Sequence, residues 1–333
     1  MREIARRRYA APRVVPRVAS LVWDGDDLVD FVGGGHRFHP DGSVTESRRA
    51  YAFPFDGAVL SPSGTYAVLY ASRGTKALVV EHGRDLREIN RSYYHADAYE
   101  YPVALGRLAD GREVLVHCPD AYNRIEVEEV ASGRRLTGRS GEAVDVFHSR
   151  LQVSVSGRYL LSAGWVWHPL DVVAVFDLEE GQRDPTSLDR HGLAAPPIEN
   201  EVEAAAFDGD DLLVATNPDD EWWGRDRSGG LGPGEVGLWS FAEERWRRRC
   251  RPQGRVGTLM PLGDHAVGFY DHPKLIDLST GAVVRSWPEL SSGRQTSSII
   301  WGLKEGRPPL ALDPAHARFA VADGEGITVV QLG

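Results

Sequence analysis

The sequence is poor in cysteine and has no long apolar run. Cys118 and Cys250 are the two cysteines among 333 residues, and they are too far apart to predict a disulfide framework or a C-x-x-C pair. Two reduced thiols are therefore expected, in a cytoplasmic protein. No apolar stretch approaches the roughly 20 residues that a membrane-spanning helix needs. The basic segment MREIARRRYAAPR at the N-terminus lacks the apolar core of a secretory signal.

Negative charge exceeds positive charge, and three common catalytic or cofactor-binding motifs are absent from the sequence. The formal net charge is −10, whereas affinity for nucleic acid comes mainly from clustered Lys and Arg. The one dense basic run, RWRRRCR at 245–251, is predicted to be the solvated outer face of a strand. The chain contains no G-x-S-x-G elbow, no P-loop and no C-x-x-C-H haem attachment. We expect neither nucleic acid nor a membrane as a partner.

A long-period repeat runs along the chain. Three stretches align on a short apolar strand, a tight turn and a second alternating strand: AVLSPSGTYAVLYAS from Ala58, QVSVSGRYLLSAG from Gln152 and LALDPAHARFAVAD from Leu310. With weaker copies included, the turns anchor at Gly25, Gly64, Gly111, Gly157, Gly209, Gly263 and His316. The steps between these anchors are 39, 47, 46, 52, 54 and 53 residues, near the ~40–50 residues of a four-stranded propeller blade.

Third and fourth strands follow several of these copies, as in VVAVFDLEEG and AVVRSW. The sequence therefore predicts an all-β fold, a seven-bladed β-propeller of four-stranded antiparallel blades in a single domain over 1–333. The blades are expected to start near residues 17, 57, 101, 150, 202, 257 and 308. The last copy ends at Gly333 after three strands. Residues 1–16 are then a closing strand and linker, and we predict that Glu3 to Tyr9 completes the last blade and closes the ring.

The SPSG-to-strand and VFDL-x-x-G patterns resemble those of WD40-like and YVTN-type bacterial β-propellers over nearly the whole chain. The copies lack the Trp-Asp dipeptide at the end of the third strand and the Gly-His start, so the hydrogen-bonded tetrad of true WD40 repeats is not expected here. The resemblance implies an architecture rather than an activity. Such families include structural platforms, lactonases, lyases and dehydrogenase subunits.

The loops of such a propeller divide between two faces. Connections from the first to the second strand and from the third to the fourth strand are short turns, and we call their side the bottom face. The remaining connections, on the top face, are longer and carry aromatic residues, histidines and carboxylates, so we expect the working surface there. The ligand-binding candidates are Tyr94, His95, Asp97, His148, Trp165, Trp167, His168, Glu201, Trp222, Trp223 and His272.

Two functions remain open for this face. The leading hypothesis is a ligand- or protein-binding propeller that takes a protein partner or a small molecule near the central axis, where Trp and Tyr would supply binding area. The alternative is a metal-assisted hydrolase or lyase in the same pocket, with His95 or His148 as general base. One divalent metal ion on His95, His148 and Glu201 is the one cofactor considered. The same side chains could instead hydrogen-bond neighbouring loops.

Two tryptophan pairs raise a question of orientation. In AGWVWHPLD, the rings of Trp165 and Trp167 share one face if the strand continues through both residues. They either pack on the neighbouring blade or open on the pocket. Trp222 and Trp223 precede the glycine-rich run SGGLGPG, which is typical of a loop that closes over a ligand, although both rings could also cover the tops of adjacent blades.

Overall fold

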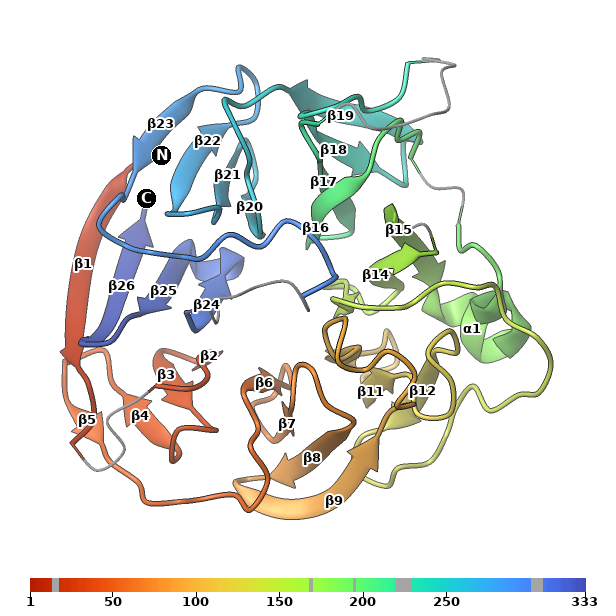
Figure 1. The fold of residues 1–333 in the computed structure, drawn as a ribbon, viewed down its shortest axis with the longest axis horizontal. Helices are drawn as coiled ribbons and strands as arrows, with labels where there is room; N and C mark the ends of the chain where they lie inside the picture. The colour runs from red at the N-terminus through yellow and green to blue at the C-terminus, as the bar shows by residue number, and fades with distance from the viewer. Residues whose placement is uncertain (14–17, 168–169, 194–195, 220–228, 301–307) are drawn as a thin grey trace.

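The computed structural model describes residues 1–13, 18–167, 170–193, 196–219, 229–300 and 308–333. Their strands form seven antiparallel sheets arranged in a ring (Figure 1). The predicted all-β, seven-bladed β-propeller is therefore confirmed. No helix within the described ranges is long and apolar enough to cross a membrane.

Five of the sheets have four strands each. Blade 1 contains β2 (Val22–Asp24), β3 (Asp27–Asp30), β4 (His36–Phe38) and β5 (Val44–Thr45). Blade 2 contains β6 (Gly57–Leu60), β7 (Tyr66–Tyr70), β8 (Lys76–Glu81) and β9 (Arg84–Asn90). Blade 5 contains β16 (Val202–Asp208), β17 (Asp211–Thr216), β18 (Val236–Ser240) and β19 (Arg245–Cys250). Blade 6 contains β20 (Leu259–Leu262), β21 (His265–Gly268), β22 (Lys274–Asp277) and β23 (Val283–Ser286). Blade 7 contains β24 (Leu310–Asp313), β25 (Arg318–Ala322), β26 (Gly326–Leu332) and β1 (Glu3–Ala10).

Blades 3 and 4 have three-stranded sheets within the described residues. Blade 3 contains β10 (Val103–Arg107), β11 (Glu113–His117) and β12 (Glu126–Glu129), and a single bridge between Glu128 and Arg135 stands where the fourth strand would pair. Blade 4 contains β13 (Gln152–Val153), β14 (Tyr159–Val166) and β15 (Leu170–Asp177), followed by α1 (Leu178–Arg183) and the short 3-10 helix η1 (Pro185–Asp189). Asp177 caps α1 by accepting from the amides of Glu179 and Glu180. These helices cover the outer side of blade 4 in place of a strand.

The two ends of the chain meet in blade 7. Strand β1 pairs with β26 from Glu3–Leu332 to Ala10–Gly326, and the two lie side by side in Figure 1. Glu3 accepts from the indole of the fully buried Trp287 at 2.7 Å and from Arg285 at 2.9 Å. The N-terminal strand therefore completes blade 7, as the missing fourth strand predicted, and its Glu3 also ties blade 7 to blade 6.

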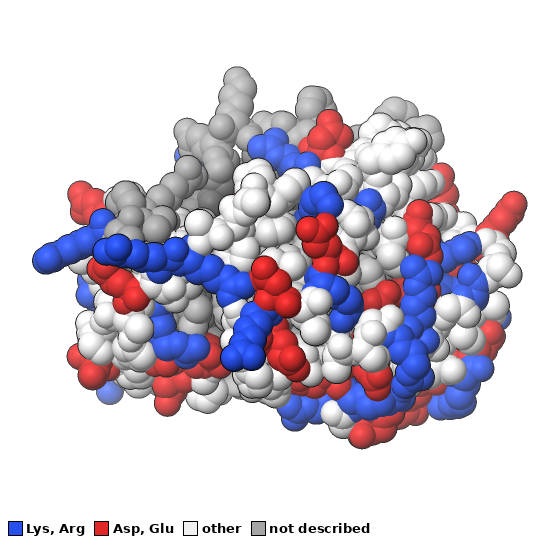
Figure 2. All heavy atoms as spheres, turned by 90° about the horizontal axis from the view of Figure 1, so that it is seen from below, with Lys and Arg blue, Asp and Glu red and all other residues white. Residues whose placement is uncertain are grey.

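The predicted turn positions and the basic run fit this architecture. The six turn glycines have left-handed φ angles between 58° and 88°, which glycine adopts without strain. At the seventh turn the left-handed residue is Ala317, with φ 47°, one position after the predicted His316. The run RWRRRCR contributes β19, the outermost strand of blade 5, where Arg247 pairs with Glu243 and Asp211. Charges of both signs are interspersed over the side of the ring in Figure 2.

Candidate functional site

An aromatic cluster lies on the top face, where the loops of blades 2, 3 and 4 meet. The Phe147 ring is its centre: it stacks on Trp165 at 4.0 Å between ring centroids and on Tyr122 at 4.2 Å. Tyr99 and Trp167 meet the same ring edge-on, at 5.4 and 5.5 Å. We call this cluster the aromatic corner, comprising Tyr94, His95, Tyr99, Tyr122, Phe147, Trp165 and Trp167.

The backbone brings the two stacked rings together. Strand β14 continues through Trp165, and the backbone amides and carbonyls of Trp165 and Phe147 exchange hydrogen bonds of 2.8 and 3.1 Å. The preceding residue of β14 must be small, because a Cβ on Gly164 would lie 1.9 Å from the Phe147 carbonyl oxygen. Glycine at this position therefore permits the close approach from which the ring stack follows.

A buried arginine fixes the loop that carries Tyr94 and His95. The Arg91 side chain donates to the carbonyl oxygens of Gly74, Ala96 and Tyr99 at 2.8, 2.5 and 3.0 Å. Its guanidinium also lies 4.5 Å from the centroid of the Tyr99 ring. Burial lowers the pKa of Arg91. The loop is thus anchored from below by a cation whose hydrogen-bond partners are mostly backbone carbonyls.

The upper part of the corner is exposed. Tyr93, Tyr94 and Trp167 are exposed to 86%, 42% and 41%, and His95 is exposed as well. The His95 ring is 4.5 Å from that of Tyr94 and 5.2 Å from that of Trp167. We call these four residues the aromatic patch. The rings of Tyr94, His95 and Trp167 contact the buried Phe147 ring at 5.9, 6.0 and 5.5 Å between centroids, so packed rings support three of the four residues from below.

The orientation of Trp165 and Trp167 is now defined. Their rings are 5.3 Å apart and both contact Phe147, so they lie on the same side, although β14 ends at Val166 and the condition of a strand through both residues is not met. Trp165 is 4% exposed and packs against Tyr99 of the loop leading into blade 3. Trp167 stands above it at the surface. Trp165 thus packs on the neighbouring blade, and Trp167 remains open to solvent.

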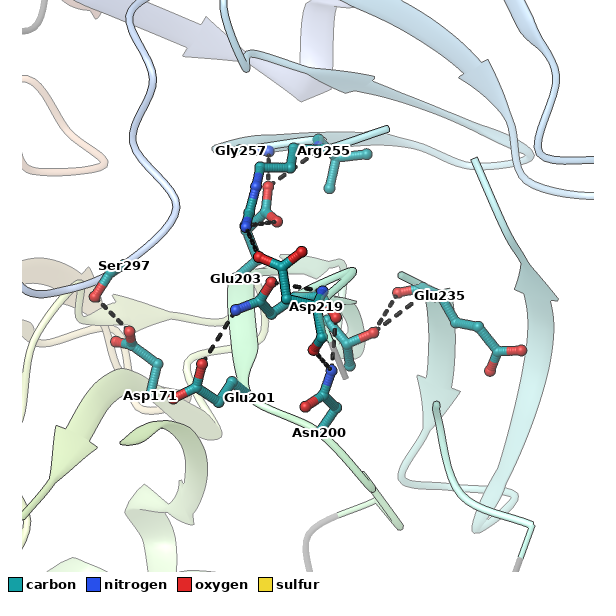
Figure 3. A network of polar contacts seen from close by, with 12 residues as sticks. Asp171, Asn200, Glu201, Glu203, Asp219, Glu235, Arg255, Gly257 and Ser297 are labelled. Atoms are coloured by element: carbon teal, nitrogen blue, oxygen red, sulfur yellow. Dashed lines mark hydrogen bonds and ion pairs between the residues drawn. The ribbon is translucent and has the colours of Figure 1, made fainter. Parts of the chain in front are cut away.

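A second region of the top face, formed by blades 4 to 6, is polar (Figure 3). The side chain of Glu203 is fully buried, accepts from the amides of Val256 and Gly257 at 3.0 and 2.6 Å, and pairs with Arg255 at 3.3 Å. Burial raises the pKa of Glu203, and the two amides and Arg255 oppose that shift. Arg255 also pairs with Asp219.

Asp171 belongs to the same region and holds a distant segment. Its carboxylate accepts from the Ser297 hydroxyl, and from the amide and hydroxyl of Ser298 at 2.9 and 2.6 Å. Arg150 faces it at 3.7 Å. We call the group Asp171, Glu203, Asp219, Arg255, Ser297 and Ser298 the polar network.

The segment that Asp171 holds, residues 292–300, crosses the middle of the ring, and we call it the axial segment (Figure 1). It leaves blade 6, where the Ser292 hydroxyl donates to the Phe269 carbonyl at 2.7 Å and Gly293 bridges to Asp271. It reaches the loop leading into blade 3, where the Ile300 amide donates to the Ala98 carbonyl at 2.7 Å. The centre of the top face, where the sequence led us to expect an open pocket, is therefore crossed by the chain itself.

The remaining candidates have separate environments. His148 is buried, its Nδ1 lies 3.0 Å from the Ser162 hydroxyl, and burial lowers its pKa to about 4. It is a neutral core histidine at pH 7 rather than an accessible base. Glu201 accepts from Asn217 at 3.1 Å, and His272 lies 3.4 Å from Asp271. His168, Trp222 and Trp223 lie outside the described residues.

The expected metal ligands are not brought together. Within the part of the chain that the structure describes, no group of three or more His, Cys, Asp or Glu side chains is arranged to hold a metal ion. His95 lies in the aromatic corner and His148 is buried against Phe176. The hydrolase or lyase alternative therefore gains no ligand set from these residues.

Comparison with known proteins places the chain by its fold. No family model matches the sequence, and no curated protein matches it. Among solved structures, a chain of the mitotic checkpoint complex matches with a TM-score of 0.55 at 13% identity, over 98% of this chain and 91% of that chain. A chain of Kuenenia stuttgartiensis hydrazine synthase matches with 0.59 at 15% identity, over 96% of both. The β-propeller domain of Myceliophteria thermophila Cps50 (Swd1) matches with 0.56 at 12% identity, over 95% of this chain and 97% of that domain.

The chain shares its fold with WD40-type β-propellers. Identities of 12–15% show this architecture and no more. The candidates drawn from the sequence omit three residues of the aromatic corner, Tyr99, Tyr122 and Phe147, and also Arg91, which anchors the loop beneath it. A signal for Phe147 is present in DVFHSR, because adjacent residues of an extended segment point to opposite sides. With His148 directed into the core, Phe147 is the residue that faces the top.

Proposed function

We propose that the chain is a protein-binding β-propeller that recognises its partner through the aromatic patch on the top face. The observation that carries this proposal is the exposure of Tyr94 and Trp167, whose rings both contact the buried Phe147 ring. Rings held in place before binding lose little conformational entropy when a partner covers them. Trp and Tyr are also enriched among the residues that dominate binding energy.

The rest of the top face favours the aromatic patch, rather than the central axis, as the binding site. The axial segment crosses the centre, and the polar network pairs its carboxylates internally. The similar structures include a checkpoint complex, a propeller domain and an enzyme, so they agree with a binding role without selecting a partner. We further propose a single domain over 1–333 that works in the cytoplasm, which two unpaired cysteines support.

The test compares variants on opposite faces. Tyr94→Ala/Trp167→Ala removes the centre of the patch, whereas Val155→Ala truncates a residue that is 88% exposed in a bottom-face turn. Each protein is used to capture partners from native cells by quantitative crosslinking, and the captured partner is then purified and titrated. We expect at least about tenfold weaker binding for the double variant, the scale of a hot-spot residue, and unchanged binding for Val155→Ala. Equal affinities for all three proteins would overturn the proposal.

A further inference from the structure

Two acidic side chains of the top face, in blades 5 and 6, face arginines of the same chain: Glu203 pairs with Arg255 at 3.3 Å and Asp271 with Arg294 at 3.0 Å. The field of these carboxylates is largely cancelled by the neighbouring cations, and they attract an incoming charge only weakly.

The carboxylates beside the aromatic patch are different. Asp97, two residues after His95, and Asp145 are exposed, and neither forms an ion pair with a residue that the structure describes. Asp145 accepts from the Tyr122 hydroxyl at 2.7 Å, which places it beside a ring that is 5.1 Å from Tyr94. Arg124, two residues after Tyr122, donates to the Gly141 carbonyl. Asp145 thus lies beside the rings and Asp97 lies on the loop that carries Tyr94 and His95, while the one cation of this loop, Arg91, is buried beneath it and donates to backbone carbonyls.

The faces of aromatic rings and uncompensated carboxylates attract the same kind of ligand. The π-electron face of Tyr or Trp is negative and draws a cation, most often an arginine guanidinium, which stacks on it and keeps its N–H groups free to donate. A carboxylate at the ring edge then accepts those donors. A protein of net charge −10 also favours the approach of a basic partner over an acidic one.

We infer that the aromatic patch takes a cationic segment of a partner protein, with an arginine or lysine side chain stacked on Tyr94 and Trp167 and its charge directed to Asp97 and Asp145. This inference rests on the proposed function and specifies the chemistry of the partner. Arg91 serves the site as a positioning residue, because it fixes the loop from Tyr93 to Asp97 through carbonyls below the rings.

The probe is a phage-displayed library of random 12-residue peptides, selected against the full-length chain. Three variants are selected in parallel: Tyr94→Ala/Trp167→Ala removes the rings, Asp97→Asn/Asp145→Asn removes the charges, and Glu244→Gln/Asp264→Asn removes two charges from bottom-face turns, one of them the exposed partner of Arg248. We expect the wild-type chain and the bottom-face variant to enrich peptides rich in Arg and Lys. The ring variant should enrich none of them, and the charge variant should lose the preference for basic residues.

The outcomes separate the two proposals. Peptides that depend on Tyr94 and Trp167 but carry no excess of Arg or Lys would overturn the cationic partner and leave the binding patch standing. Failure to obtain any peptide that depends on these rings would overturn both. For an enriched peptide, fluorescence anisotropy should show binding about fivefold to tenfold weaker at 300 mM than at 50 mM NaCl, since exposed charges are screened at that ionic strength. An affinity independent of salt would also contradict the inference.

Discussion

The aromatic corner and the polar network occupy the same face of one ring, yet they differ in what they leave unsatisfied. In the polar network, buried carboxylates accept from amides and hydroxyls and face arginines, so the interactions end within the chain. In the aromatic corner the lower rings are buried and stacked, while the upper rings and two carboxylates face solvent. One region builds the top of the propeller, and the other presents a surface to a partner.

The difference follows from the cost of burial. A buried carboxylate is stable only when donors and cations surround it, and a network that meets this demand has little capacity left for a ligand. An aromatic ring has no such demand and can remain half-exposed on a packed base. Side chains that do not need hydrogen-bond partners within the fold are therefore the ones available for recognition.

The largest loss of stability should follow from breaking the stack beneath the patch. Phe147→Ala removes the ring that contacts both Trp165 and Tyr122, and we expect the free energy of unfolding to fall by about 3–5 kcal/mol, as for other buried Phe truncations. Urea denaturation measures it, with Tyr93→Ala as the exposed control. A loss below about 1 kcal/mol would show that the stack does not support the corner.

Removing the Arg91 cation below the loop should lower the free energy of unfolding somewhat less than Phe147→Ala does. Arg91→Leu leaves the carbonyl oxygens of Gly74, Ala96 and Tyr99 without this donor, and we expect a loss of about 3 kcal/mol in unfolding free energy, because unsatisfied buried acceptors are costly. Arg91→Lys should fall between the wild type and Arg91→Leu, since an ammonium cannot reproduce the planar fork of donors. The exposed Arg73→Ala is the control. Equal stabilities of Arg91→Leu and Arg73→Ala would contradict the anchoring role.

Acid should act with opposite sign on two buried groups, His148 in the core against Phe176 and Glu203 in the polar network. The pKa of His148 is lowered to about 4 by burial, so the folded state binds fewer protons than the unfolded state, and stability is lost as the pH falls below about 6.5 toward 4. At pH 4.5 the protonation of His148 should have lowered the free energy of unfolding by about 2.5 kcal/mol relative to neutral pH. In His148→Gln this part of the loss between pH 7 and pH 4.5 should be absent. The raised pKa of Glu203 has the reverse effect, because protonation relieves its desolvation. Denaturant titrations of His148→Gln and Glu203→Gln at both pH values test the two signs.

The sequence predicted the propeller and the positions of six turn glycines because these patterns repeat along the chain, and it predicted the ring closure because the last repeat lacks a fourth strand. It also predicted that Trp165 and Trp167 share a face if a strand runs through both; β14 ends at Val166, and the contact of both rings with Phe147 brings them to the same side. These properties depend on residues close in sequence or on a fixed period.

The parts that it did not predict depend on contacts between distant loops. The Asp171 carboxylate and the Ser298 amide are 127 positions apart and meet at 2.9 Å, and no periodicity links their positions. His148 looked like an accessible ligand because a histidine in a loop does not reveal its burial. The polar network and the axial segment could therefore be found only in three dimensions.

Loosening the axial segment should have a moderate effect. Asp171→Asn keeps one acceptor oxygen but replaces the other by an NH₂ group that cannot accept from Ser297 or Ser298. We expect a loss of about 1–2 kcal/mol in unfolding free energy and faster amide hydrogen exchange in residues 292–300. Asp219→Asn, which alters a largely exposed carboxylate, is the matched control. Unchanged exchange in the axial segment would show that other contacts hold it.

The smallest change in stability is expected at Asp97 and Asp145, whose carboxylates we assign to recognition alone. Asp97→Asn/Asp145→Asn breaks no ion pair with a described residue, and the amide oxygen introduced by Asp145→Asn can still accept from the Tyr122 hydroxyl. The free energy of unfolding should therefore stay within about 0.5 kcal/mol of wild type, and at low salt it should rise slightly because like charges are removed from a chain of net charge −10. Thermal and urea denaturation at 20 and 300 mM NaCl measure this, beside Glu244→Gln/Asp264→Asn. A loss above about 1.5 kcal/mol would make these carboxylates structural, as Asp171 and Glu203 are, and the distinction between the two regions would no longer hold.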